Sequence, residues 1–114
     1  MTWTMSVIPP EGVELFWPQV ERLLSLATAY SGGRMTVEDL RGRSRLPALC
    51  MARHHAVWEM RRRRLDLAFQ QIAAELDRTN HATALHSWQV FCERVRRGDF
   101  AVERAAVEKE LGSE

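Results

Sequence analysis

The segment from Ala68 to Val90 constrains the fold of this chain most, because its pattern predicts two short helices joined by a tight turn. The first helix has an apolar face at helical spacing, made of Phe69, Ile72, Ala73 and Leu76. Asp77, Arg78 and Thr79 interrupt that pattern. A favourable N-cap for the second helix follows at Asn80, and the buried residues expected beyond it are Ala84, Leu85, Trp88 and Phe91. The segment therefore predicts a helix-turn-helix.

Polar side chains gather at the start of the second helix. His81, Thr83, His86 and Gln89 lie off its apolar face. In a helix-turn-helix the first turns of the second helix enter the major groove of DNA, where base edges present hydrogen-bonding groups and thymine methyls. We therefore expect four residues to face base edges: Asn80, His81, Ala82 and Thr83.

The formal charge of +1 hides a strong segregation of charge along the chain. Residues 41–97 carry twelve arginines against five acidic residues, whereas residues 1–40 and 98–114 each carry two basic against five acidic residues. A basic body between acidic ends is typical of a protein that binds a polyanion.

The rest of the chain also has helical patterns, with no strand pattern and no internal repeat. Four further helix starts are indicated by a proline in the first turn or by a capping side chain, at Pro18, Thr36, Pro47 and Asp99. The helix from Pro47 has an apolar stripe of Leu49, Ala52, Ala56 and Met60. We predict an all-α fold, a compact bundle of about five or six helices with one core. It comprises an arm at 1–17, a helix-turn-helix domain at 18–98 and a C-terminal helix at 99–114.

Arginines are concentrated just before and along the long helix. Arg41, Arg43 and Arg45 alternate in a predicted loop, a spacing that lets side chains clamp phosphates or enter a narrow minor groove. Arg53 adds a cation from the helix that follows. Arg61 to Arg64 form a run that is common at a solvated helix end, and with Gln70 they are second-rank candidates for phosphate contacts.

Motifs for catalysis and for metal binding are missing from the sequence. It has no GxSxG, no paired-carboxylate pocket and no glycine-rich phosphate loop, and Lys109 lies outside any GxxxxGK[ST] context. His54 and His55 are adjacent and His81 and His86 are five apart, so neither pair has the spacing of metal ligands on one helix face. We expect no enzyme activity, no metal and no cofactor.

The sequence predicts a cytoplasmic, nucleoid-associated protein. No apolar run is long enough to cross a membrane, and the first ten residues lack the basic region and cleavage site of a secretory signal. Cys50 and Cys92 have no CxxC partner, and we expect both to be reduced and buried. The N-terminal arm is more apolar than a solvated tail, with Trp3, Met5, Val7, Ile8, Phe16 and Trp17. It either packs across the bundle or docks on another protein.

From Val20 to Val95, approximately, the chain resembles the C-terminal DNA-binding domain of the bacterial replication initiator DnaA. That family carries the signature Gly-x-Arg-Asp-His-Thr-Thr-Val-x-His at its recognition helix, and here Arg78-Thr-Asn-His-Ala-Thr-Ala-Leu-His86 stands in its place. Three positions match residue for residue: His81, Thr83 and His86. Upstream, residues 36–45 are similar to the family's approach to its basic loop, and residues 52–56 fall where the family has its Arg-Gln-x-Ala helix start.

The resemblance implies that Arg43 or Arg45 enters the minor groove while residues 80–83 read the adjacent major groove. The full set of candidate DNA-binding residues is Arg41, Arg43, Arg45, Arg53, Gln70, Arg78, Thr79, Asn80, His81, Ala82, Thr83 and His86. Four of them depart from the family: Gln70 replaces Pro, Thr79 replaces Arg, Asn80 replaces Asp and Ala82 replaces Thr. These departures predict a preferred site other than the initiator's own box.

The initiator's ATPase domain is missing, and in this the chain is similar to DNA-binding modules of some prophage and gene transfer agent regulators. We therefore expect sequence-selective binding of duplex DNA that regulates transcription. Two alternatives stay open. One is a replication modulator that competes for initiator boxes, and the other is an interaction module that docks on RNA polymerase or on a replication protein.

Overall fold

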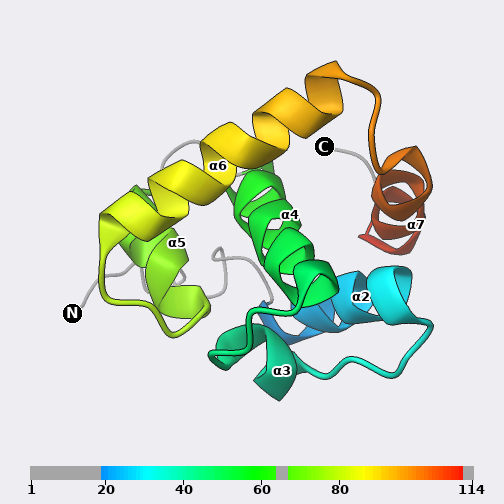
Figure 1. The fold of residues 1–114 in the computed structure, drawn as a ribbon, viewed down its shortest axis with the longest axis horizontal. Coiled ribbons are helices and arrows are strands. Elements are labelled where there is room, and N and C mark those ends of the chain that lie inside the picture. The colour runs from blue at the N-terminus through cyan, green and yellow to red at the C-terminus, as the bar shows by residue number, and fades with distance from the viewer. Residues whose placement is uncertain (1–18, 64–66, 112–114) are drawn as a thin grey trace, which may run out of the picture.

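The computed structural model describes residues 19–63 and 67–111, and these residues form an all-α bundle with no strand among them. Its helices, numbered as in Figure 1, are α2 (Gln19–Ser31), α3 (Val37–Arg41), α4 (Pro47–Arg63), α5 (Phe69–Glu75), α6 (His81–Arg96) and α7 (Ala101–Leu111). Helix α4 lies in the middle. Helix α6 crosses it, α5 packs on one side, and α2, α3 and α7 lie on the other (Figure 1). The all-α prediction is confirmed.

The helix ends follow the local signals in the sequence. Ser31 ends α2, and Gly32 and Gly33 follow with φ of 67° and 98°, the left-handed region that glycine adopts without strain. Thr36 and Asp39 form the predicted capping box, since the Thr36 hydroxyl accepts from the Asp39 N–H at 3.1 Å and the Asp39 carboxylate accepts from the Thr36 N–H at 3.0 Å.

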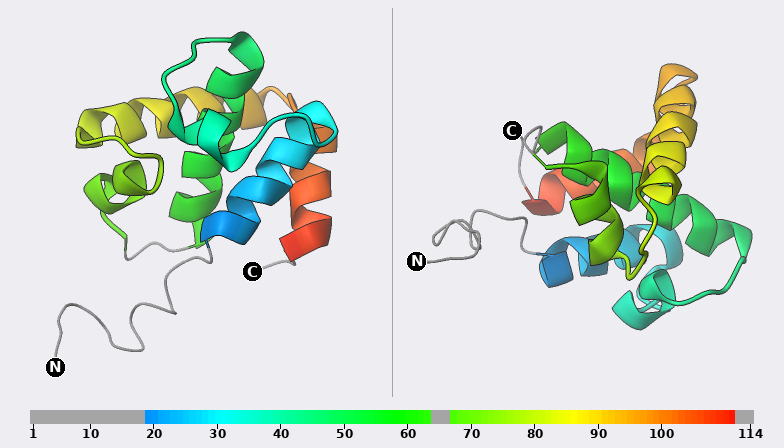
Figure 2. Two further views of the ribbon diagram at one scale, coloured as in Figure 1. Left: turned by 90° about the horizontal axis from the view of Figure 1, so that it is seen from below. Right: turned by 90° about the vertical axis from the view of Figure 1, so that its left-hand side faces the viewer.

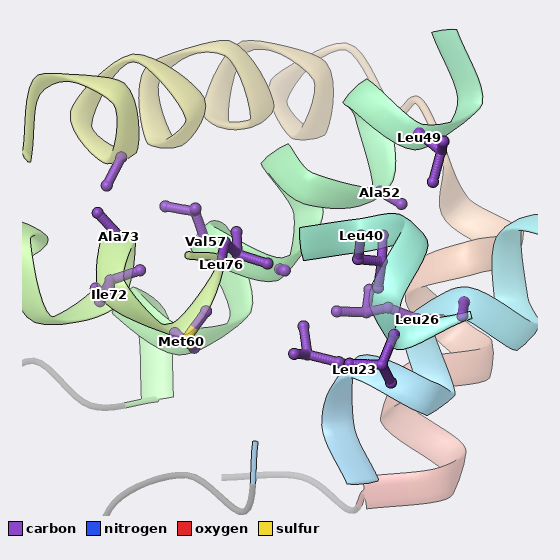
Figure 3. Close-up of a cluster of buried hydrophobic side chains, with 14 of the residues drawn as sticks. Leu23, Leu26, Leu40, Leu49, Ala52, Val57, Met60, Ile72, Ala73 and Leu76 are labelled. Atoms are coloured by element: carbon purple, nitrogen blue, oxygen red, sulfur yellow. The ribbon is translucent and has the colours of Figure 1, made fainter. Parts of the chain in front are cut away.

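One apolar core joins both sides of α4. The predicted stripe of this helix is buried throughout, at Leu49, Ala52, Ala56 and Met60. Figure 3 shows residues of α5 directed towards Val57 and Met60, while leucines of α2 and α3 meet on the other side. Helix α4 thus fixes the position of α5 and α6 relative to the rest of the bundle.

Two helices joined by a tight turn form where the sequence predicts them, with α5 and α6 connected by residues 76–80. Asp77 has a φ of 58°, and the Arg78 N–H donates to the Ala73 carbonyl at 2.9 Å while the Asp77 N–H donates to the Ala74 carbonyl at 3.0 Å. These two bonds are those of a Schellman motif, which ends α5 sharply. The turn therefore gets its shape from backbone bonds around one left-handed aspartate.

The buried face of α6 differs in part from the predicted one. Ala84 and Phe91 are buried as expected, whereas Trp88 is only half-buried and Leu85 is 37% exposed. Ser87 is buried instead, because the face of α6 that meets α4 is centred on Ala84, Ser87 and Phe91. The prediction of Leu85 as a core residue is therefore wrong. The small polar side chain of Ser87 faces α4 in place of a leucine.

Helix α7 belongs to the bundle and lies beside α2 (Figure 2). Its Val107 is fully buried. Gly98 and Phe100 both have positive φ, and the helix begins at Ala101, so Asp99 is not its N-cap. The carboxylate of Asp99 instead pairs with Arg94 at 3.2 Å, which ties the end of α6 to the turn before α7.

Candidate nucleic-acid interface

The loop between α3 and α4 is held from inside by Arg53 of α4. Its Nε donates to the Leu40 carbonyl at 2.7 Å, and its two terminal nitrogens donate to the carbonyls of Ser44 and Asp39 at 2.6 and 3.0 Å. Arg53 is buried. The prediction that it contacts phosphate is therefore revised, because its guanidinium is used to shape the loop.

Arg78, in the turn between α5 and α6, holds the same loop from the opposite side. Its terminal nitrogens donate to the carbonyls of Arg41 and Gly42 at 3.1 and 2.7 Å and to that of Leu76 at 2.8 Å. Arg41 turns towards α5, where its Nε donates to the Glu75 carbonyl at 2.9 Å. Arg41 and Arg78 thus join the loop and the end of α3 to α5 and its turn, while Arg53 joins them to α4. The role of these three predicted DNA-contacting arginines is positional.

Arg43 and Arg45 remain exposed at the tip of this loop. Both line a cavity of about 360 Å³ that the loop forms with α4, the turn after α5 and the first turns of α6. Thr83 of α6 lines the same cavity. Residues of the basic loop and of the start of α6 therefore lie on the same side of the molecule.

The first turn of α6 presents side chains to solvent. His81, Ala82, Thr83 and His86 are exposed, as are Gln70 at the start of α5 and Thr79 in the turn. Asn80 caps the helix, since its Oδ1 accepts from the Ala82 N–H at 2.8 Å. This bond uses one of the two acceptor positions of the Asn80 oxygen, and it leaves the two amide hydrogens of Asn80 as donors.

His54 joins α4 to α6, a contact that was not predicted from the sequence. Its Nδ1 lies 2.8 Å from the Ser87 hydroxyl, and its ring meets that of His86 edge-on at 5.9 Å. Burial, together with the positive charges of His86, Arg53 and Arg94, lowers the pKa of His54 from 6.5 to about 4. The signal in the sequence is a serine on the face of α6 that should be apolar.

The basic run at the end of α4 points away from the loop and pairs with acidic side chains. Glu59 is buried, and its carboxylate contacts His55 at 2.9 Å, Arg63 at 2.9 Å and Arg62 at 3.2 Å. Both arginines also contact Glu108 of α7, at 2.9 and 2.8 Å. We call these five residues the acid-paired cluster. Arg62 and Arg63 therefore lose their place as phosphate candidates.

Burial lowers the pKa of His55, and the hydrogen bond to Glu59 opposes that change. For Glu59, burial would raise the pKa, but the bonds from His55 and Arg63 and the charge of Arg62 hold it below its usual value. The carboxylate is therefore ionised at neutral pH.

The other two arginines of the basic run do not belong to this cluster. Arg61 donates to the Leu67 carbonyl at 2.7 Å and lies over the Phe69 ring, and Arg64 lies outside the described residues.

The structure also bears on the predictions for the cysteines, for metal binding and for membrane spans. Cys50 and Cys92 are free thiols, but each is half-buried rather than buried. Within residues 19–63 and 67–111, no group of three or more metal-ligating side chains is placed to hold an ion. No helix in this part of the chain has the length and hydropathy to span a membrane. The apolar N-terminal arm lies outside the described residues.

Comparisons with protein-family models, curated proteins and solved structures found no match to this chain. The resemblance to the DnaA domain therefore stays a prediction that rests on the residues quoted above.

Proposed function

We propose that this protein binds duplex DNA with sequence preference and regulates transcription from the bound site. The observation that carries the proposal is that Arg43, Arg45 and Thr83 line one cavity, so a basic loop and an exposed helix start face the same side. That arrangement suits simultaneous contact with the phosphate backbone or minor groove and with an adjacent major groove.

The arginines that hold the loop support this role. Loops that read DNA must be held in place before binding, because ordering a free loop costs conformational entropy. Arg53 and Arg78 fix this loop through backbone carbonyls, and neither bond uses the side chains of Arg43 or Arg45. The two exposed guanidinium groups are then free to contact phosphate or the minor groove.

The polar start of α6 supports sequence preference. His81, Thr83 and His86 offer donors and acceptors, and Ala82 offers a methyl that fits against thymine. Asn80 can donate its amide hydrogens while its oxygen caps the helix. We expect the strongest preference at the base pairs that face Ala82 and Thr83.

The test is selection of bound sequences from a random duplex pool, followed by affinity measurements at one salt concentration. An enriched motif different from the initiator's box supports a transcriptional reader. Enrichment of the initiator's box would point to a replication modulator, and no enrichment would overturn the proposal in favour of an interaction module. A Thr83→Ala variant should relax preference at one position by about 1 to 3 kcal/mol. Gln89→Ala, about two and a half helical turns from the cap, is its matched control.

A further inference from the structure

The cavity beside the basic loop has the size of a ligand site. Its volume of about 360 Å³ is at the small end of the range for small-molecule pockets. Four segments form its walls: the loop, α4, the end of α5 with the turn, and the start of α6. The residues that line it are Arg43, Ser44, Arg45, Cys50, Arg53, His54, Val57, Ala73, Leu76, Arg78, Thr83, Ala84 and Ser87.

The walls carry positive charge that they do not neutralise. Four arginines line the cavity and none of its lining residues is acidic. Burial and the charges of Arg53 and Arg43 lower the pKa of Arg78, even though Asp77 acts in the opposite direction. The arginines therefore repel one another at close range, and an anion between them would relieve that repulsion.

Two of these arginines are held in place before any ligand arrives. Arg53 and Arg78 donate to carbonyls at the end of α3 and in the loop through hydrogen bonds of 2.6 to 3.1 Å. A guanidinium has five N–H donors, so each arginine keeps N–H groups that these bonds do not use. The carbonyls fix the arginine side chains without neutralising their positive charge. This arrangement favours the binding of an anion such as phosphate, which a guanidinium can bind with two parallel hydrogen bonds.

The other walls of the cavity are apolar. Val57, Ala73, Leu76 and Ala84 are buried residues that also line it. A DNA phosphate brings no apolar group to such a surface, whereas an organic phosphate does. The combination of an arginine rim and an apolar wall therefore favours a ligand with an anionic head and an apolar or heteroaromatic body.

We propose that this cavity binds a small organic phosphate, a phosphate monoester with a flat apolar or heteroaromatic body. The phosphate lies among Arg43, Arg45 and Arg78, and the body lies against Val57 and Leu76. Because the cavity opens on the proposed DNA-binding face, the ligand and duplex DNA exclude each other. This last step rests on the proposed function, while the binding of the phosphate does not.

The first experiment titrates the full chain without DNA, using phenyl phosphate and inorganic phosphate as probes in a calorimeter. We expect phenyl phosphate to bind at least about tenfold tighter than inorganic phosphate, because only phenyl phosphate buries apolar surface. Arg45→Ala should weaken the binding of phenyl phosphate by about tenfold. Arg97→Ala, just beyond the end of α6 and outside the cavity, should leave that affinity unchanged. Equal affinity for the two probes would indicate a bare phosphate site and overturn the organic ligand.

The second experiment uses the two thiols of the chain as an internal control. Cys50 lines the cavity and Cys92 does not, and both are half-buried. Phenyl phosphate should slow alkylation of Cys50 and leave the rate at Cys92 unchanged, as measured by mass spectrometry of the two peptides. No protection of Cys50 at a saturating probe concentration would overturn the site.

A competition experiment separates this inference from the proposed function. Phenyl phosphate should displace the selected duplex, and the Arg45→Ala variant should need a higher concentration. Duplex binding without phenyl phosphate binding would overturn the ligand site and leave DNA binding intact. Phenyl phosphate binding without any duplex binding would overturn the DNA-binding proposal and leave the ligand site intact.

Discussion

The arginines around the basic loop and those of the acid-paired cluster are both partly buried, yet they are partnered in opposite ways. At the loop, Arg53 and Arg78 donate to backbone carbonyls. In the cluster, Arg62 and Arg63 contact the carboxylates of Glu59 and Glu108. A carbonyl satisfies the hydrogen bonds of a guanidinium and leaves its charge, whereas a carboxylate cancels the charge as well.

This difference explains how one chain with little net charge keeps a basic surface. The acidic residues of α4 and α7 neutralise the cations at the end of α4, and no acidic residue lines the cavity beside the loop. Charge that is not cancelled there is available to steer a polyanion. The charge of this surface therefore depends less on the net charge of the chain than on whether each arginine is partnered by a carbonyl or by a carboxylate.

The largest effect should follow from removing the central carboxylate of the acid-paired cluster. Glu59→Gln leaves Arg63 buried with less compensation, and breaking a buried ion pair destabilises a protein by about 3 to 5 kcal/mol. Urea denaturation measures this change. Glu93→Gln, at an exposed carboxylate of α6 that pairs with Arg96 and Arg97, is the matched control and should not change the unfolding midpoint. Equal midpoints for the two variants would show that the cluster is not a buried ion network.

The next effect concerns the carbonyl-bound arginine. Arg53→Lys keeps the positive charge but cannot reach three carbonyls at once, so it should destabilise the protein by on the order of 2 to 4 kcal/mol. Exposed Arg45→Lys is the control and should melt like the parent. If the Arg53→Lys variant is as stable as the parent, charge and not hydrogen-bond geometry holds the loop.

A smaller effect on folding but a clear effect on binding is expected at the loop tip. Replacing Arg43 and Arg45 together with Ala should weaken binding to every duplex and flatten the plot of log affinity against log salt by up to about two units. The matched control replaces Arg96 and Arg97, two exposed arginines at the far end of α6. If the two double variants change the slope equally, the loop does not contact the DNA.

The smallest effect is a pH dependence at His54. Its pKa is lowered from 6.5 to about 4 in the folded protein, so between these pH values the unfolded chain takes up a proton that the folded protein does not. Stability should therefore fall as the pH decreases from 6.5 towards 4. His54→Gln should reduce this fall, while exposed His81→Gln should leave it unchanged, as measured by urea denaturation at pH 7 and pH 5.

The helices could be predicted from the sequence because their signals are local. Pro47 in a first turn and the Thr36 capping box act within a few residues, and both are found where they were predicted. Pro18 lies outside the described residues, and Asp99 does not cap α7. The turn between α5 and α6 followed from the same kind of local signal. The exposure of Leu85 did not, because periodicity alone does not say which side of α6 meets α4.

The candidate site was only half predictable. Exposed Arg43 and Arg45 and the polar start of α6 follow from the local sequence. Arg53 and Arg78, however, reach carbonyls of α3 and of the loop that lie 9 to 37 residues away. Nothing in local spacing indicates that an arginine will turn inward towards a distant carbonyl. By contrast, His55 and Glu59 are one helical turn apart, and that spacing was a signal for a buried pair.

The carbonyl-held loop has a consequence for how this protein can change. Every residue offers the same backbone carbonyl, so the bonds that hold the loop do not depend on which side chains stand at positions 43 and 45. Ser44 differs, because its hydroxyl accepts from the Leu46 N–H at 3.3 Å. Gly42 is also restricted, since a Cβ atom there would lie 3.2 Å from the Glu38 carbonyl oxygen. Natural variation or laboratory selection can therefore replace residues 43 and 45 without refolding the domain, and new binding preferences can arise there one side chain at a time.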